Sequence, residues 1–121
     1  NQITTQLAKL QNRSEGAMTM PMVIRVPYGG GIGAIEHHSE SPEAYFAHTP
    51  GLVVVMPRSP IQAKGLLLSC IRSNDPCLFF EPKALYRIAE EEVPVEDYMI
   101  PLGKAEVLKE GKDITLIAYG L

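Results

Sequence analysis

Residues 29–43, with the sequence GGGIGAIEHHSESPE, hold most of the groups with which this chain could do chemistry. Gly29, Gly31 and Ala34 match a dinucleotide-binding fingerprint, in which glycine amides approach a pyrophosphate. That chemistry needs a helix directly after the glycines, whereas the next helix signal comes only at Ser41. The glycines are therefore better explained by a compact loop that needs positive φ angles or close backbone approach.

The histidines offer two further kinds of chemistry. His37, His38 and His48 could bind zinc together with Glu40 or Glu43, but adjacent histidines point their rings in different directions, and zinc sites have a compact, regular ligand spacing. One of the adjacent pair could instead act as an acid or base, since histidine is the side chain that titrates near neutral pH unaided. His48 is expected to end a helix. The residue types alone do not choose between His37 and His38.

Composition limits the classes of partner. The chain has 121 residues, the size of one domain, with 45% hydrophobic and 21% charged residues, which is typical of a globular core. Its net charge of −3 provides no basic surface for a nucleic acid. No apolar run approaches the roughly 18 residues of a membrane span. We therefore expect neither nucleic acid nor membrane as a partner, and we expect Cys70 and Cys77 to be reduced thiols.

The elements that must position these residues alternate between helix and strand. Short apolar runs predict strands, of which the one at 52–56 is expected to be covered on both faces. Ser41 and Ser59, each followed by proline, are expected to be helix N-caps. The expected strands are 21–26, 52–56 and 77–81, and the expected helices are 3–16, 43–48 and 61–73. This alternation predicts an α/β fold with a parallel sheet and flanking helices.

The C-terminal part of the chain has a different pattern. Residues 90–103 are acidic, contain prolines and predict an extended surface linker. Residues 104–120 predict a hairpin that turns at 110–112 and continues into a strand over Ile114–Tyr119. Because the chain opens on a helical pattern and closes on a strand, we expect it to be part of a longer polypeptide.

Three long blocks carry a family resemblance: residues 21–60, residues 62–87 and residues 93–120. They resemble the β subunit of the thiamine-diphosphate-dependent 2-oxo acid dehydrogenases across essentially the whole chain. AKGLLLSCI, FFEPK and LYR are most similar to the branched-chain (2-oxoisovalerate) enzyme. Some bacterial pyruvate and acetoin enzymes come close to the same pattern.

The resemblance implies how the chain is divided and what it assembles with. It implies a partial pyrimidine-binding domain over 1–89, a linker over 90–103 and the start of a C-terminal domain over 104–121. The partners would be an α subunit and a second β subunit in an α2β2 heterotetramer, and a lipoyl-bearing acyltransferase component. Thiamine diphosphate would lie at the α–β interface, with magnesium bound by the α subunit. The main β-side cofactor contacts are expected upstream of residue 1, with none inside this chain.

The implied activity is oxidative decarboxylation of a 2-oxo acid, followed by acyl transfer to a lipoyl group. The compartment would be the mitochondrial matrix in a eukaryote or the cytoplasm in a bacterium. This chain alone is expected to lack decarboxylase activity and to bind the cofactor poorly. A different kind of function, a non-catalytic module that only pairs with an α subunit, stays open.

The resemblance also implies site residues. The family's active-site histidine directly precedes Ser-x-Ser-Pro-Glu, which is His38 here. Its implied role is to orient the enamine or lipoyl intermediate and balance its protons during acyl transfer. Gly33 stands where some branched-chain relatives have a second histidine, so a two-histidine site is not expected. A structural potassium site of backbone carbonyls is implied at Met20, Met22, Val23, Cys70, Ser73 and Asp75.

Overall fold

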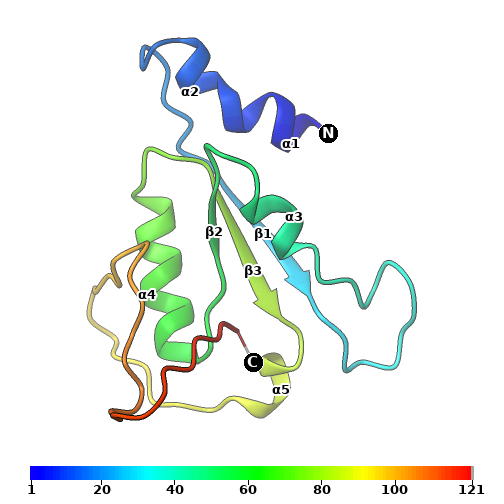
Figure 1. The fold of residues 1–121 in the computed structure, drawn as a ribbon, viewed down its shortest axis with the longest axis vertical. Coiled ribbons are helices and arrows are strands. Elements are labelled where there is room, and N and C mark those ends of the chain that lie inside the picture. Colours follow the sequence, from blue (N-terminus) through cyan, green and yellow to red (C-terminus); the bar gives the residue numbers. More distant parts are fainter. Residues whose placement is uncertain (121) are drawn as a thin grey trace.

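The centre of the molecule is a parallel sheet of three strands. A computed structural model describes residues 1–120; Leu121, the last residue of the predicted 104–121 unit, lies outside the described residues. The strands are β1 (Val23–Tyr28), β2 (Val53–Val55) and β3 (Cys77–Pro82), in the spatial order β1-β3-β2 (Figure 1). Both outer strands align with Cys77 of β3, through Val23 and Val53. The predicted α/β fold with a parallel sheet is confirmed.

The strand order decides which strand is fully covered. β3 lies between its two neighbours, and all six of its residues are buried. Residues 52–56 contact the cores on both faces, as predicted, with Val53 and Val55 on one side and Val54 on the other, but β2 is an edge strand in which only Val55 is buried. Apolar composition reports that a strand is buried somewhere, but it does not report whether the strand has one neighbour or two.

Side chains of β3 alternate between two small cores, as expected from the period of a strand. Cys77 and Phe79 pack with Val55 and Cys70, on the face covered by α4 (Pro60–Ile71). Leu78 and Phe80 pack with Tyr28 on the opposite face, where Ile3 of the N-terminal segment and Phe46 of α3 (Glu43–Ala47) complete the cluster. The sheet therefore has helical cover on both faces.

The N-terminal segment is a broken helix. In place of one helix over 3–16, the chain forms α1 (Gln2–Thr5), the 3₁₀ helix η1 (Leu7–Lys9) and α2 (Leu10–Arg13). The 3₁₀ turn falls where Ala8 is buried against Gly51, so closely that a Cβ added to Gly51 would collide with the Ala8 carbonyl oxygen. Another short helix that the sequence pattern did not predict, α5 (Leu85–Ile88), follows β3. None of the helices within residues 1–120 has the length and apolar character needed to cross a bilayer.

The two Ser-Pro pairs behave differently. Ser59 caps α4 as predicted: its hydroxyl accepts a hydrogen bond from the Gln62 N–H at 3.4 Å. Ser41 is not a cap, so that prediction is wrong. The N-cap of α3 is Pro42, whose φ of −86° and ψ of 5° place it before the helix, and no side chain caps this end. His48 is the C-cap of α3, which confirms its predicted place at a helix end.

Residues 90–103 have no helix or strand and pack along α4. Gly65 makes this possible, because a Cβ there would lie 2.7 Å from a ring carbon of Tyr98. The Lys64 ammonium donates to the carbonyl of Glu96 at 2.9 Å, and Arg72 pairs with Asp97 at 2.8 Å. The predicted extended segment is therefore fastened to one helix face.

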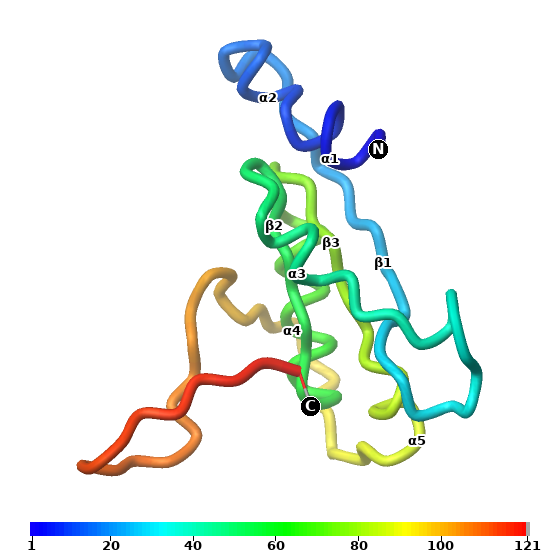
Figure 2. The backbone as a smooth tube through the Cα atoms, turned by 45° about the vertical axis from the view of Figure 1, so that its right-hand side comes forward, coloured from blue at the N-terminus to red at the C-terminus, as the bar shows by residue number. Residues whose placement is uncertain are grey.

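The predicted hairpin over 104–120 is wrong, since none of these described residues is in a strand. In both views this segment loops away from the sheet before it returns towards the carboxyl ends of the strands (Figures 1 and 2). Ile114, Leu116 and Ile117 are exposed along it. This apolar run has the propensity of a strand, but a strand forms only when it pairs with a neighbour, and none of the described segments pairs with it.

Candidate functional site

A loop of residues 29–42 connects β1 to α3 and projects from the carboxyl end of the sheet, in cyan in Figures 1 and 2. Gly29, Gly31 and Gly33 have φ angles of 84°, 95° and 73°, which confirms the prediction of a loop that needs positive φ. The Gly29 N–H donates to the Glu40 carbonyl at 2.9 Å and closes the base of the loop. Between the end of β1 and Glu43 no helix begins, so the glycines do not lead into a helix N-terminus that could bind a pyrophosphate.

The two adjacent histidines lie near the end of this loop in different conformations. His37 has a φ of 64°, and its side chain is 83% exposed with Nδ1 4.0 Å from Glu40 Oε1. His38 is also exposed, but its ring Nδ1 lies 3.3 Å from the Glu36 carbonyl oxygen, and its backbone N–H donates to that oxygen at 2.8 Å. With Nδ1 as the donor, Nε2 is the acceptor, which is the form of imidazole that can take up a proton.

A lysine beyond the loop contacts the residue just before the loop and one residue within it. The Lys83 N–H donates to the Tyr28 carbonyl at 3.1 Å, and the Lys83 ammonium donates to the His38 carbonyl. Lys83 is not among the predicted site residues, and it is 45 positions from His38 in the chain. Only its place at the end of the FFEPK block marks it in the sequence, at the end of the strand beside β1.

A cavity of about 270 Å³ lies at the base of the loop, at the carboxyl end of β1 and β3. Glu43 is 9% exposed there, and its Oε2 is buried with no hydrogen-bond partner within residues 1–120. Burial raises the pKa of the nearby Tyr28 above its usual value, and the charges of Glu43 and Tyr119 add to this. The cavity is lined by Tyr28, Gly29, Gly30, Ser41, Glu43, Pro82, Lys83, Ala84 and Tyr119. Open α/β sheets bind ligands at this edge.

A polar cluster holds α5 against the sheet next to Lys83. Glu81 of β3 is buried and accepts hydrogen bonds from Arg25 of β1 and from the Tyr86 hydroxyl of α5. Burial acts to raise the pKa of Glu81, but the bonds from Arg25 and Tyr86 outweigh it and lower that pKa below its usual value. Burial and the Glu81 carboxylate raise the pKa of Tyr86 to about 12. The cluster therefore fixes the Glu81 carboxylate near the carboxyl end of β3.

The histidines that could have bound zinc do not all lie together in the described structure. His48 is at the end of α3, and the three histidines do not gather around one point with Glu40 or Glu43. Within residues 1–120, no three histidine, cysteine, aspartate or glutamate side chains are grouped so that they could hold a metal ion. Cys70 and Cys77 are free and buried in the core.

The six positions of the implied potassium site fall in two runs of backbone that lie side by side. The Met20 N–H donates to the Asn74 carbonyl at 3.1 Å, and the Cys77 N–H donates to the Met22 carbonyl at 2.8 Å. The second run includes the end of α4, where the Cys70 carbonyl accepts from the Ser73 N–H at 3.2 Å. Carbonyl oxygens are ligands that hard cations accept, but the Cys70 carbonyl here also accepts from the Cys77 thiol at 3.9 Å, so the potassium site stays a prediction.

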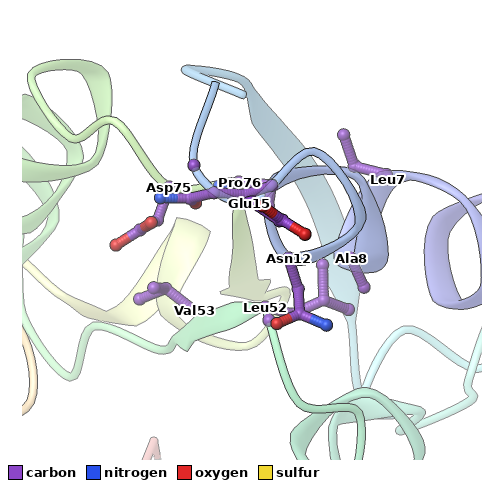
Figure 3. Close-up of a pocket in the computed structure, with 11 residues that line it drawn as sticks. Leu7, Ala8, Asn12, Glu15, Leu52, Val53, Asp75 and Pro76 are labelled. Carbon is purple, nitrogen blue, oxygen red and sulfur yellow. The ribbon is translucent and has the colours of Figure 1, made fainter. Parts of the chain in front are cut away.

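A larger cavity of about 490 Å³ lies at the opposite, amino end of the strands (Figure 3). Figure 3 shows Leu7 and Ala8 of the N-terminal segment on one side and Val53 and Asp75 on the other. No residue of the loop 29–42 lines it. The cavity is therefore separate from the histidines, and it adjoins the second run of carbonyls through Asp75.

The comparison with known families decides what kind of domain this is. The family model described as "Transketolase, pyrimidine binding domain" matches residues 4–89. The chain belongs to this family. The loop at the carboxyl end of the sheet is therefore part of a pyrimidine-binding domain of the kind found in thiamine-diphosphate enzymes.

Relatives of this pyrimidine-binding domain include β subunits of two kinds of dehydrogenase. The chain is 53% identical over 118 residues to pyruvate dehydrogenase E1 component subunit beta of Acholeplasma laidlawii, covering 98% of this chain and 36% of that protein. It is 52% identical over 121 residues to 2-oxoisovalerate dehydrogenase subunit beta of Bacillus subtilis (strain 168), covering 100% and 37%. The mitochondrial 2-oxoisovalerate dehydrogenase subunit beta of Dictyostelium discoideum is 56% identical over 121 residues, covering 99% and 33%.

These identities confirm the resemblance to β subunits of 2-oxo acid dehydrogenases, branched-chain or pyruvate. The chain spans about a third of the length of these relatives: the aligned region is 36%, 37% and 33% of their respective lengths. Identities of 53% to a pyruvate enzyme and 52% to a 2-oxoisovalerate enzyme do not separate the two substrates.

The pyrimidine-binding domain implies thiamine diphosphate, and the residues present can be tested against it. A diphosphate with its metal ion needs a group of oxygen ligands, and residues 1–120 gather no such set of acidic side chains. The lysine in the cavity already donates its ammonium to His38. The described residues therefore do not fit the whole cofactor, and we assign none of them as a cofactor ligand.

Proposed function

We propose that this chain is the histidine-bearing part of the β subunit of a branched-chain 2-oxo acid dehydrogenase. The reaction is the oxidative decarboxylation of a 2-oxo acid, followed by transfer of the acyl group to a lipoyl group. The observation that carries the proposal is His38, exposed on a glycine-built loop at the carboxyl end of the sheet with its ring Nδ1 3.3 Å from the Glu36 carbonyl oxygen. The 56% identity to a 2-oxoisovalerate dehydrogenase subunit beta supports it.

His38 would act as the acid/base of acyl transfer. Hydrogen bonding of Nδ1 to the Glu36 carbonyl leaves Nε2 as the atom that exchanges a proton with the incoming lipoyl sulfur. The loop itself orients this ring, because both the ring and the backbone N–H of His38 bond to the same carbonyl. His37 faces solvent at a positive φ and is not assigned a role in the reaction.

The surroundings of the site belong to the same proposal. The chain would provide a pyrimidine-binding domain over 1–89, a linker over 90–103 and the start of a C-terminal domain over 104–121. Thiamine diphosphate and magnesium would be held mainly by an α subunit and by β-subunit residues upstream of residue 1. The assembly would be α2β2, serving a lipoyl-bearing acyltransferase, in the mitochondrial matrix of a eukaryote or the cytoplasm of a bacterium. Residues 1–121 alone would be inactive and bind the cofactor poorly.

The choice of substrate is tested with the full-length β subunit assembled with its α partner. We expect kcat/KM for 2-oxoisovalerate to exceed that for pyruvate by about tenfold or more, since each extra methylene in an apolar pocket contributes roughly 10–200-fold. Decarboxylation rates with the two acids, measured side by side, check this. A preference for pyruvate would support the pyruvate or acetoin alternative, and an assembled tetramer that decarboxylates neither acid would support the non-catalytic pairing module.

The potassium site is a structural part of the proposal. The carbonyls of Met20, Met22, Val23, Cys70, Ser73 and Asp75 would hold the ion and join the end of α4 to the start of β1. We expect the melting temperature of the assembled enzyme to rise by several degrees when potassium replaces sodium at equal ionic strength, because an ion at 100 times its Kd stabilises by about 2.7 kcal/mol. Met22→Leu should keep this response, since only the carbonyl of this exposed residue is used. Equal melting temperatures in the two salts would contradict the site.

A further inference from the structure

The loop that carries His38 is supported from outside at one residue. Within residues 1–120, the bonds of residues 30–40 are made inside the loop or to Gly29 at its base, with one exception. The exception is the ammonium of Lys83, which donates to the His38 carbonyl. Every other bond of this segment moves with the loop, so Lys83 alone relates the position of His38 to the sheet.

Lys83 is well placed to hold the loop because it is itself fixed to the sheet. It directly follows Pro82, the last residue of the fully buried strand β3. Its N–H donates at 3.1 Å to the carbonyl of Tyr28, the last residue of β1 and the residue before the loop. The backbone of Lys83 thus binds Tyr28, directly before the loop, and its side chain binds His38 within the loop.

The bonded atom makes this contact specific to His38. A hydrogen bond to the carbonyl of His38 fixes the peptide unit that follows it, while the Glu36 carbonyl fixes the ring and the N–H that precedes it. The donor is charged, and bonds of this kind are shorter and stronger than neutral ones. Together the two anchors define where Nε2 points.

We propose that Lys83 is a positioning residue for His38, holding the imidazole at the geometry needed for acyl transfer. This rests on the proposed function of His38. Lys83 would not touch the reacting atoms, and its loss would leave the imidazole present but in a range of positions. Proton transfer requires a heavy-atom distance of about 2.6–3.2 Å, so a mobile loop lowers the rate without removing the group.

Lys83→Met in the full-length β subunit, assembled with its α partner, tests this. The change removes the ammonium and keeps the N–H that binds Tyr28. We expect kcat for lipoyl acylation to fall about tenfold with the KM for the 2-oxo acid unchanged, since the lost bond is a single charge-assisted one. Amide exchange across residues 29–42 should quicken by a similar factor with no change in melting temperature. Lys83→Arg should restore both, and Lys112→Met, an exposed lysine in the C-terminal segment, is the matched control.

The outcomes separate this inference from the function on which it rests. If His38→Ala slows acylation but Lys83→Met changes neither kcat nor loop exchange, the positioning role is wrong and the histidine stays. If Lys83→Met lowers the melting temperature, or Lys83→Arg fails to restore acylation, the lysine is structural and the inference is overturned. If His38→Ala has no effect, the proposed function itself fails.

Discussion

Replacing His38 with alanine in the full-length β subunit, assembled with its α partner, is expected to slow lipoyl acylation by at least about a hundredfold. Acid/base groups contribute typically 10²–10⁴-fold to a rate. His38 is exposed, so the substitution should change the free energy of unfolding by no more than about 0.5 kcal/mol. Single-turnover acylation of a lipoyl domain measures the first quantity, and urea unfolding measures the second.

The matched control for this experiment is the neighbouring histidine. His37 has a φ of 64°, a region that asparagine tolerates better than alanine, so His37→Asn removes the imidazole with little backbone strain. We expect this variant to retain nearly full acylation activity. Comparable losses in His37→Asn and His38→Ala would show that the pair acts together, and full activity in His38→Ala would refute the assignment of the acid/base.

The sequence predicted the elements of the fold better than their arrangement. The apolar run at 77–81 predicted β3 to within a residue, because a short run of buried side chains between prolines is a local signal. That β3 lies between the other two strands follows from how the crossovers place them, which no single segment encodes. The run at 52–56 is just as apolar, and yet β2 is an edge strand.

Local sequence patterns also gave wrong predictions where the structure of a segment depends on residues outside the pattern. Ser59 caps its helix and Ser41 does not, although both precede proline, because the conformation of Pro42 delays the start of α3 to Glu43. Residues 114–119 are an apolar run with the propensity of a strand, but no described strand pairs with them. In both cases the residue types permit the predicted structure, but the neighbouring residues or strands determine whether it forms.

The candidate site, like the fold, could be predicted only in part from the sequence. The loop glycines were predictable, since positive φ angles restrict the choice of residue. His38 was chosen over His37 by family resemblance, and the structure adds that the two differ in backbone conformation and in ring contacts. Lys83 and the buried state of Glu43 were not predictable, because they depend on which strand ends lie side by side.

The core beneath the loop provides the second large effect. Phe80 of β3 has 0% exposure, and its ring lies 5.6 Å from that of Tyr28, edge to face, and 5.9 Å from that of Phe46. Tyr28 directly precedes the loop 29–42, and Phe46 lies in α3, which follows it. One buried ring therefore supports both ends of the segment that presents His38.

Phe80→Ala is expected to lower the free energy of unfolding by about 3–5 kcal/mol, the range for removing a buried aromatic ring. That is a large part of the roughly 5–15 kcal/mol that stabilises a typical domain. Urea unfolding of this chain measures the loss. Phe80→Leu, which keeps most of the volume, is the control and should cost clearly less than the alanine variant. A loss below about 1 kcal/mol in Phe80→Ala would mean that the site relaxes to fill the cavity.

Phe80 and Lys83 should then affect the loop in distinguishable ways. Phe80 supports the residues that flank the loop, so Phe80→Ala should quicken amide exchange in β1, α3 and the loop together and reduce stability. Lys83 contacts the loop from outside the core, so its loss should quicken exchange in the loop alone. If Phe80→Ala left exchange in α3 unchanged, the packing of Phe46 on Phe80 would not be what holds that helix to the sheet.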